Sequence, residues 1–117
     1  MILEVAVLQV RQGQGSAFEK AFAEAQATLS SMDGYVSHQL HRCIEVADKY
    51  VLLVHWRQIE DHTVGFRRSA GYQKWKQALH HFYDPFPVVE HFEMLYSENA
   101  RQASEGLTGV RLNQAGY

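Results

Sequence analysis

Residues 61–75, DHTVGFRRSAGYQKW, gather the side chains of this chain that are best suited to acid–base chemistry on a flat ligand. The ordinary pKa of a histidine is about 6.5, so the neutral imidazole of His62 can accept a proton at pH 7. Phe66 lies four residues later, so on a helix the two side chains point the same way. Tyr72 can donate a hydrogen bond to a ligand oxygen, and Trp75 can pack against its rings. This stretch is therefore a candidate for the lining of a pocket.

Arg67 and His80 add polar groups to this candidate pocket. Arg67 can offset negative charge on a ligand, and His80, near the end of the same helical segment, can contact it. Each residue also has an ordinary structural interpretation: His62 as an exposed side chain, the aromatic rings as core, and the two polar groups as solvated or helix-end charges. A cavity of about 300 Å³ or more with converging polar groups favours binding or catalysis, whereas a solid core favours the structural interpretation.

The composition of the 117-residue chain excludes several classes of partner and site. Its length fits one domain, and a net charge of −2 gives no electrostatic footprint for nucleic acid or an anionic membrane. The single cysteine, Cys43, excludes an intrachain disulfide, and no histidine pair has metal-binding spacing, so we predict no metal. The N-terminus lacks a basic segment, Glu4 interrupts its apolar run, and no apolar stretch reaches the roughly 18 residues of a membrane span. We therefore expect a cytoplasmic protein.

The hydrophobic pattern predicts the order strand, helix, strand, strand, interrupted helix, strand. The predicted elements are strands over residues 2–11, 35–42, 49–56 and 88–96, a helix from Ser16 to the turn at Asp33 and Gly34, and helical pieces over 59–68 and from Ser69 to the proline-rich stop at 84–87. Ser16 and Glu19 have the spacing of a capping box, and Ser69 resembles a second N-cap. Gly65 and Gly71 are expected to relieve the kink between the two helical pieces.

This order is the split βαβ, or ferredoxin-like, arrangement, an α+β fold with a four-stranded antiparallel sheet. Its helices cover one face of the sheet, yet most of the predicted strands are apolar on both faces. A bare apolar face of this size is unfavourable in water, so we predict an isologous homodimer in which a second copy covers it. Residues 98–117 are a polar C-terminal tail outside the domain at 1–97.

Three stretches in this order carry a resemblance to a known family: the strand YVLLVHW, the interrupted helix FRRSAGYQKW and the closing strand VVEHFEMLY. Together they resemble the antibiotic biosynthesis monooxygenase domain family of dimeric α+β barrels, over about residues 2–96. The resemblance implies the fold and the dimer. Some members of that family oxidise anthrone- or quinol-type aromatics with molecular oxygen, using no metal, flavin or haem. Others degrade haem, and others isomerise small metabolites.

The residues at the family's site positions separate these branches. Haem-degrading members use an asparagine, a tryptophan and a histidine that binds the haem iron. The positions in this chain that match them by resemblance are Ala6, Phe66 and Lys76, so the axial ligand is missing. Anthrone-oxidising members have an asparagine, a tryptophan and a tyrosine, and the matching positions here are His62, Phe66 and Tyr72. Only the tyrosine is the same, which puts the identity of the substrate in doubt.

With these residues, the resemblance predicts a cofactor-independent monooxygenase that acts on a small aromatic, anthrone- or quinol-like substrate. The predicted catalytic residues are His62 and Tyr72, and the predicted substrate-binding residues are Phe66, Trp75, Arg67 and His80. No cofactor is expected. Two alternatives stay open: a non-catalytic dimeric domain that binds a small ligand, and an isomerase in which His62 shuttles a proton.

Overall fold

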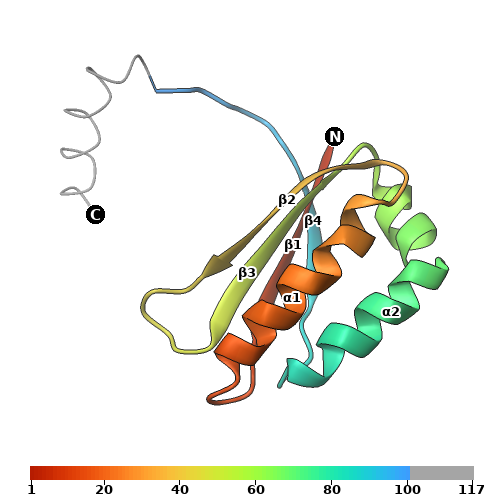
Figure 1. Ribbon diagram of the computed structural model, residues 1–117. Coiled ribbons are helices and arrows are strands. Elements are labelled where there is room, and N and C mark those ends of the chain that lie inside the picture. The colour runs from red at the N-terminus through yellow and green to blue at the C-terminus, as the bar shows by residue number, and fades with distance from the viewer. Residues whose placement is uncertain (101–117) are drawn as a thin grey trace.

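The computed structural model describes residues 1–100 and has the predicted element order (Figure 1). The elements are β1 (Ile2–Gln9), α1 (Gly15–Ser30), β2 (Tyr35–Arg42), β3 (Lys49–Trp56), the π-helix η1 (Asp61–Phe66), α2 (Ala70–Leu79), the short 3₁₀ helix η2 (His80–Phe82) and β4 (Val89–Glu93). The α+β class and the four-stranded antiparallel sheet are thereby confirmed. The predicted bounds of β2 and β3 agree with the structure at both ends.

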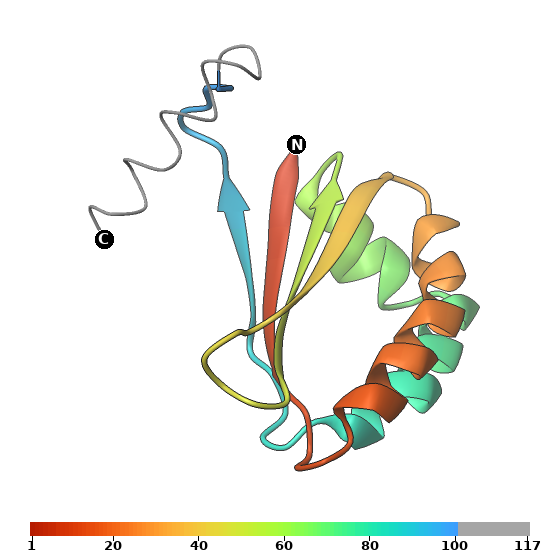
Figure 2. The same ribbon diagram turned by 60° about the vertical axis from the view of Figure 1, so that its left-hand side comes forward.

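The sheet has the strand order β2-β3-β1-β4, so the two most apolar strands lie at its centre. All of its pairings are antiparallel, with Ile2 opposite Trp56 and Gln9 opposite Lys49 in the central pair. On its other side β1 pairs with β4, where Ile2 lies opposite Glu93. Both long helices lie on the same face of the sheet, and the opposite face is left uncovered (Figure 2).

Strand alternation places the core between the sheet and the helices. In β3 every second residue is buried, and the others are half-buried on the uncovered face. The buried set of β3 is Tyr50, Leu52, Val54 and Trp56. From α1, Phe18, Phe22 and Leu29 pack against these side chains, at the helical spacing that the sequence predicts. Burying each large apolar side chain contributes about 1.5–3 kcal/mol, so this interface dominates the stability of the fold.

The predicted capping box of α1 is wrong. The helix begins at Gly15, and its N-cap residue Gln14 makes no side-chain capping bond. The Glu19 carboxylate instead accepts hydrogen bonds from Arg42, at 2.8 Å, and from the Tyr50 hydroxyl, at 2.6 Å. A charge-assisted bond to a guanidinium is stronger than one to a backbone amide, so Glu19 ties α1 to the sheet and does not reach back to the helix start.

The break in the second helix lies where the sequence predicts it. Ser69 has an extended conformation, and its hydroxyl accepts a hydrogen bond from the Tyr72 amide at 3.1 Å. The piece before the break is a π-helix, in which the Arg67 amide donates to the His62 carbonyl at 3.3 Å. A Cβ at Gly71 would lie 2.7 Å from the Met32 Cε and 3.0 Å from the Thr28 Cγ2 of α1, so this glycine lets α2 approach α1 closely.

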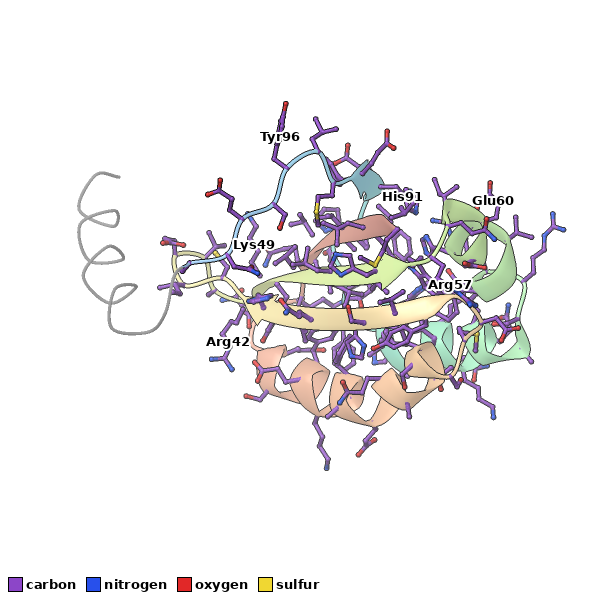
Figure 3. All side chains as sticks on the ribbon, turned by 90° about the horizontal axis from the view of Figure 1, so that it is seen from above. Arg42, Lys49, Arg57, Glu60, His91 and Tyr96 are labelled. Carbon is purple, nitrogen blue, oxygen red and sulfur yellow. The ribbon has the colours of Figure 1, made fainter. Side chains whose placement is uncertain are left out.

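Strand β4 is shorter than predicted, because the chain leaves the sheet after Glu93. Met94, Leu95 and Tyr96 are 64%, 82% and 94% exposed, and Figure 3 shows Tyr96 projecting away from the body of the protein. These residues therefore pair with no neighbouring strand within residues 1–100. The predicted polar tail falls almost entirely on residues 101–117, which lie outside the described part of the chain.

Among residues 1–100, no helix is both long enough and apolar enough to cross a bilayer.

Gly34 occupies the turn between α1 and β2, and its φ of +81° is unfavourable for a residue with a Cβ. A Cβ at this position would also collide with the Asp61 side chain, which accepts a hydrogen bond from the Gln58 amide. Gly13 has nearly the same φ, +78°, but open space around it. We expect Gly13→Ala to lower the free energy of unfolding by about 1 kcal/mol and Gly34→Ala by about 3 kcal/mol, measured by urea denaturation. Equal losses would contradict the crowding at Gly34.

Candidate functional site

A cavity of about 380 Å³ lies between the helical face of the sheet and the segment from η1 to β4. Its volume is within the range of small-ligand sites and above the value that separates a site from a solid core. All the site residues predicted from the sequence line it: His62, Phe66, Arg67, Tyr72, Trp75 and His80. Their positions around one cavity are a fact of the structure, whereas their roles stay predictions.

His62 is buried, not the exposed side chain of the ordinary interpretation. It is 4% exposed, and its ring stacks on Trp56 with centroids 5.6 Å apart and 22° between the planes. Phe66 packs beside both rings, with its centroid 6.2 Å from that of His62 and 5.9 Å from that of Trp56. The π-helical turn of η1 directs both residues inward, and they point the same way, as their spacing in the sequence predicts.

Glu4 is a site residue that the sequence reasoning missed. It is 6% exposed and lines the cavity, and its Oε1 accepts a hydrogen bond from the Trp56 indole N–H at 2.9 Å. The same oxygen lies 3.4 Å from the Nε2 of His62. The signal was present in the sequence, because Glu4 shares the inward-facing register of β1 with Ala6 and Leu8. A carboxylate in such a register requires a partner in the fold.

His91 of β4 was also missed. Its Nε2 lies 2.8 Å from the Nδ1 of His62, at hydrogen-bond distance, and the two ring centroids are 5.0 Å apart. Figure 3 places His91 at the edge of the sheet, next to η1. Its side chain is only partly buried, unlike that of His62. Glu4, His62 and His91 thus form a line from the cavity to the protein surface.

Burial makes the Glu4 carboxylate more basic than the imidazole of His62, which is the reverse of the usual order of the two side chains. Burial lowers the pKa of His62 to about 3, and the charges of Arg67 and of His91 act in the same direction. Burial raises the pKa of Glu4 above its ordinary value of 4.5, although the Trp56 bond and Arg67 oppose the shift. Burial and Arg67 also lower the pKa of His91. His62 is therefore neutral at pH 7, and its ring offers one donor and one acceptor.

Aromatic side chains form the opposite wall. Phe66 makes edge-to-face contacts with Tyr72, at 5.1 Å between centroids, and with Trp75, at 5.8 Å. Tyr72 is half-buried, and within residues 1–100 no hydrogen bond is made by its hydroxyl. His80 packs edge-on against the Phe86 ring at 4.9 Å, and burial lowers its pKa. These surfaces suit a flat, apolar ligand with a polar edge.

Arg67 is the cationic group of the site. Its side chain is exposed, yet it lines the cavity, and its charge lowers the pKa of Glu4, of His62 and of His91. It is therefore placed to stabilise an anionic ligand at the cavity. Arg68, the other arginine of the segment, is exposed and is not among the lining residues.

The histidines of this site face each other directly. A zinc ion bound by His62 and His91 would need their nitrogens about 3.3 Å apart, because each Zn–N bond is about 2 Å long and the ligands are arranged tetrahedrally. The observed 2.8 Å fits a shared proton. Across residues 1–100, no three histidine, cysteine, aspartate or glutamate side chains are grouped so that they could hold a metal ion.

Comparison with known proteins gives consistent matches. The family model described as antibiotic biosynthesis monooxygenase matches residues 1–78. The chain is 50% identical over 93 residues to the uncharacterized protein YczJ of Bacillus subtilis, covering 80% of this chain and 98% of that protein. A Bordetella bronchiseptica crystal structure with the same family description is 32% identical, with a TM-score of 0.78, over 81% of this chain and 97% of that one.

A more distant structure shares the fold. SnoaB, a cofactor-independent oxygenase from Streptomyces nogalater, superposes with a TM-score of 0.60 at 23% identity, covering 86% of this chain and 97% of its own.

The low pKa of His62 makes the stability of the fold depend on pH. Because its folded-state pKa of about 3 lies below the ordinary value of 6.5, the unfolded chain binds the proton first as the pH falls. The contribution of neutral His62 is complete above the ordinary value and is lost as the pH falls toward 3. Between pH 7 and pH 5 the free energy of unfolding falls by about 2 kcal/mol for this reason.

We expect His62→Gln to remove that part of the acid sensitivity, measured as the difference in free energy of unfolding between pH 7 and pH 5. The lowered pKa values of His38 and His80 act in the same direction and stay in both proteins. The raised pKa of Glu4 acts in the opposite direction, since it favours the folded state at low pH. A variant as acid-sensitive as the parent would contradict the burial of a neutral His62.

Proposed function

Because the chain belongs to the antibiotic biosynthesis monooxygenase family, we propose that it is a cofactor-independent monooxygenase of a small, flat, reduced aromatic compound of the anthrone or quinol type. The observation that carries the proposal is the cavity, which combines aromatic walls with a buried carboxylate–imidazole pair. The likeness in fold to a cofactor-independent oxygenase adds support.

The reaction needs little from the protein besides proton transfer and exclusion of water. An activated CH₂ group loses a proton, and the resulting anion gives one electron to molecular oxygen, forming a radical and superoxide. These two combine to a peroxide, which loses water to leave a carbonyl group, so that R₂CH₂ and O₂ become R₂CO and H₂O. The site must hold the substrate, accept its proton and stabilise the anion.

The residues of the cavity match these tasks. Neutral His62 and Glu4 lie together on one wall of the cavity, and this pair can accept the proton of the substrate. The hydroxyl of Tyr72 can donate to the oxygen on which negative charge develops, and Arg67 can offset that charge. The rings of Phe66 and Trp75 pack against the substrate, and His80 contacts its far edge.

A homodimer is the second part of the proposal. Figure 2 shows that one face of the sheet has no helix over it. On this face Val7 of β1 is 49% exposed, Phe92 of β4 is 48% exposed, and Leu53 of β3 is half-buried. A second copy placed on this face by a two-fold axis would bury these residues against their own equivalents. Such an interface would leave the cavity on the helical side of each subunit.

Oxygen uptake with a panel of anthrones and quinols tests the activity. We expect Tyr72→Phe to lower kcat about 100-fold, because the donor is lost while the ring that packs on Phe66 stays. Tyr96→Phe is the matched control, since Tyr96 is 94% exposed and is not among the residues that line the cavity. Binding of these compounds without any oxygen uptake above the buffer rate would support the non-catalytic alternative. Isomerisation without oxygen uptake would support the isomerase.

Sedimentation equilibrium tests the dimer. We expect Val7→Glu to yield monomers at concentrations where the parent protein is dimeric, because a charge would be buried at the two-fold interface. Val64→Glu is the matched control: Val64 is 44% exposed on η1, away from the uncovered face, and its variant should remain dimeric. A dimeric Val7→Glu protein would place the interface elsewhere.

A further inference from the structure

Glu4, His62 and His91 lie in a row from the cavity to the surface, with 3.4 Å between the facing atoms of Glu4 and His62 and 2.8 Å between those of the two histidines. Resting on the proposed function, we propose that Glu4 takes the proton from the substrate and that His62 and His91 pass it on to solvent. The proton thus leaves the cavity before the substrate anion reacts with molecular oxygen. Glu4 would be the catalytic base, and His91 would act through His62 without touching the substrate.

The position of the carboxylate supports this assignment. One oxygen, Oε1, is engaged by the Trp56 N–H at 2.9 Å and lies 3.4 Å from the Nε2 of His62. Among the described residues, no hydrogen bond is made to the other oxygen, Oε2, and Glu4 lines the cavity. The indole therefore holds one oxygen beside His62, while the second oxygen can meet a ligand.

The reversed basicity supports the order of transfer. Because the pKa of Glu4 is raised and that of His62 is about 3, a proton in this pair stays on the carboxylate and not on the imidazole. A charged His62 is therefore no resting state. The ring passes a proton by accepting at Nε2 while it donates from Nδ1 to the Nε2 of His91, 2.8 Å away.

The protons balance along this path. The C–H bond of the substrate breaks, its electron pair stays on carbon, and the proton forms an O–H bond with Glu4. A half-turn of the carboxyl group about its Cγ–Cδ bond brings this O–H to His62. The carboxyl then gives its proton to the Nε2 of His62 as the Nδ1 of His62 gives one to His91, and His91 releases one from its Nδ1 to water. The carboxylate is restored. Both imidazoles return to their first tautomers once the cavity admits water: His62, which lines the cavity, gives its Nε2 proton to that water, while His91 returns a proton to the Nδ1 of His62 and takes one from solvent. The oxidant is molecular oxygen, as in the proposed function.

The surroundings contain few groups that compete with this path. Glu4 on β1 faces Trp56 of β3 and His62 of η1, and Arg67 follows η1. From α2 and the segment after it, Tyr72 and His80 line the same cavity, but neither has a contact with the carboxylate at hydrogen-bond distance. The positive charge of Arg67 disfavours a second proton on either histidine. Both rings therefore stay neutral and can accept the proton of the next substrate molecule.

A relay to solvent has a measurable consequence. If the proton stayed on Glu4, it would return to the substrate carbon before oxygen could react. If it leaves through His91, a proton from solvent replaces it. Without oxygen and in D₂O, the protein should therefore incorporate deuterium into the CH₂ group of anthrone faster than buffer alone. NMR of anthrone measures this exchange without any turnover.

We expect Glu4→Gln to lower the exchange rate about 100-fold, toward the buffer rate, because the base is lost while an oxygen for Trp56 stays. His91→Gln should lower the rate by a smaller factor of about ten, because the proton then returns to the substrate. His41→Gln is the control, since His41 is exposed on β2 and lies outside the cavity. Exchange at the parent rate in Glu4→Gln would overturn the assignment of the base, and in His91→Gln it would overturn the relay.

A second measurement needs no substrate. In ¹⁵N-histidine-labelled protein, saturation transfer from water reports how fast the ring N–H of His62 exchanges. We expect His91→Gln to slow this exchange about tenfold and His41→Gln to leave it unchanged. Normal exchange in His91→Gln overturns the relay whatever the substrate is. Slowed N–H exchange, with neither deuterium incorporation nor oxygen uptake in the parent protein, would instead refute the proposed substrate class and leave the relay standing.

Discussion

The hydrogen bond from the Trp56 indole to Glu4 is the interaction on which the site depends. A carboxyl group inside an apolar layer is costly unless its oxygens have partners, and here the donor comes from the end of β3, directly across the sheet from the start of β1. The antiparallel register, which sets Ile2 opposite Trp56, brings the indole to the level of Glu4. The pairing of the two central strands thus fixes where the polar group of the cavity lies.

The π-helix η1 completes the arrangement from the other side. Its wider turn, closed by the bond from the Arg67 amide to the His62 carbonyl, lets His62 and Phe66 both face the sheet, with His62 stacked on Trp56. Single π-helical turns are rare and occur often at functional sites, because they change the direction of side chains without ending the helix. Ser69 then restarts the chain as α2, which brings Tyr72 and Trp75 to the opposite wall. The interrupted helix is therefore what surrounds the cavity.

Local patterns in the sequence were sufficient for the fold and for one wall of the site. The bounds of β2 and β3, the N-cap at Ser69 and the shared direction of His62 and Phe66 all follow from spacing between near neighbours in the chain. Glu4 and His91 could not be assigned in the same way, because each becomes part of the site only through pairing across the sheet. The capping box at Ser16 failed for the same reason, since Arg42, distant in sequence, attracts Glu19 more strongly.

The electrostatics of His62 also bear on its difference from the anthrone-oxidising branch, which resembles this chain but has an asparagine at that position. An asparagine side chain is neutral and offers both donors and an acceptor. A histidine with a pKa of about 3 is likewise neutral at pH 7, and its two ring nitrogens offer one donor and one acceptor. Burial against Trp56 and Phe66 therefore gives this histidine the hydrogen-bonding character of an amide. What the histidine adds is a second nitrogen that reaches His91, and with it a connection from the cavity to the outside that an amide at this position does not supply.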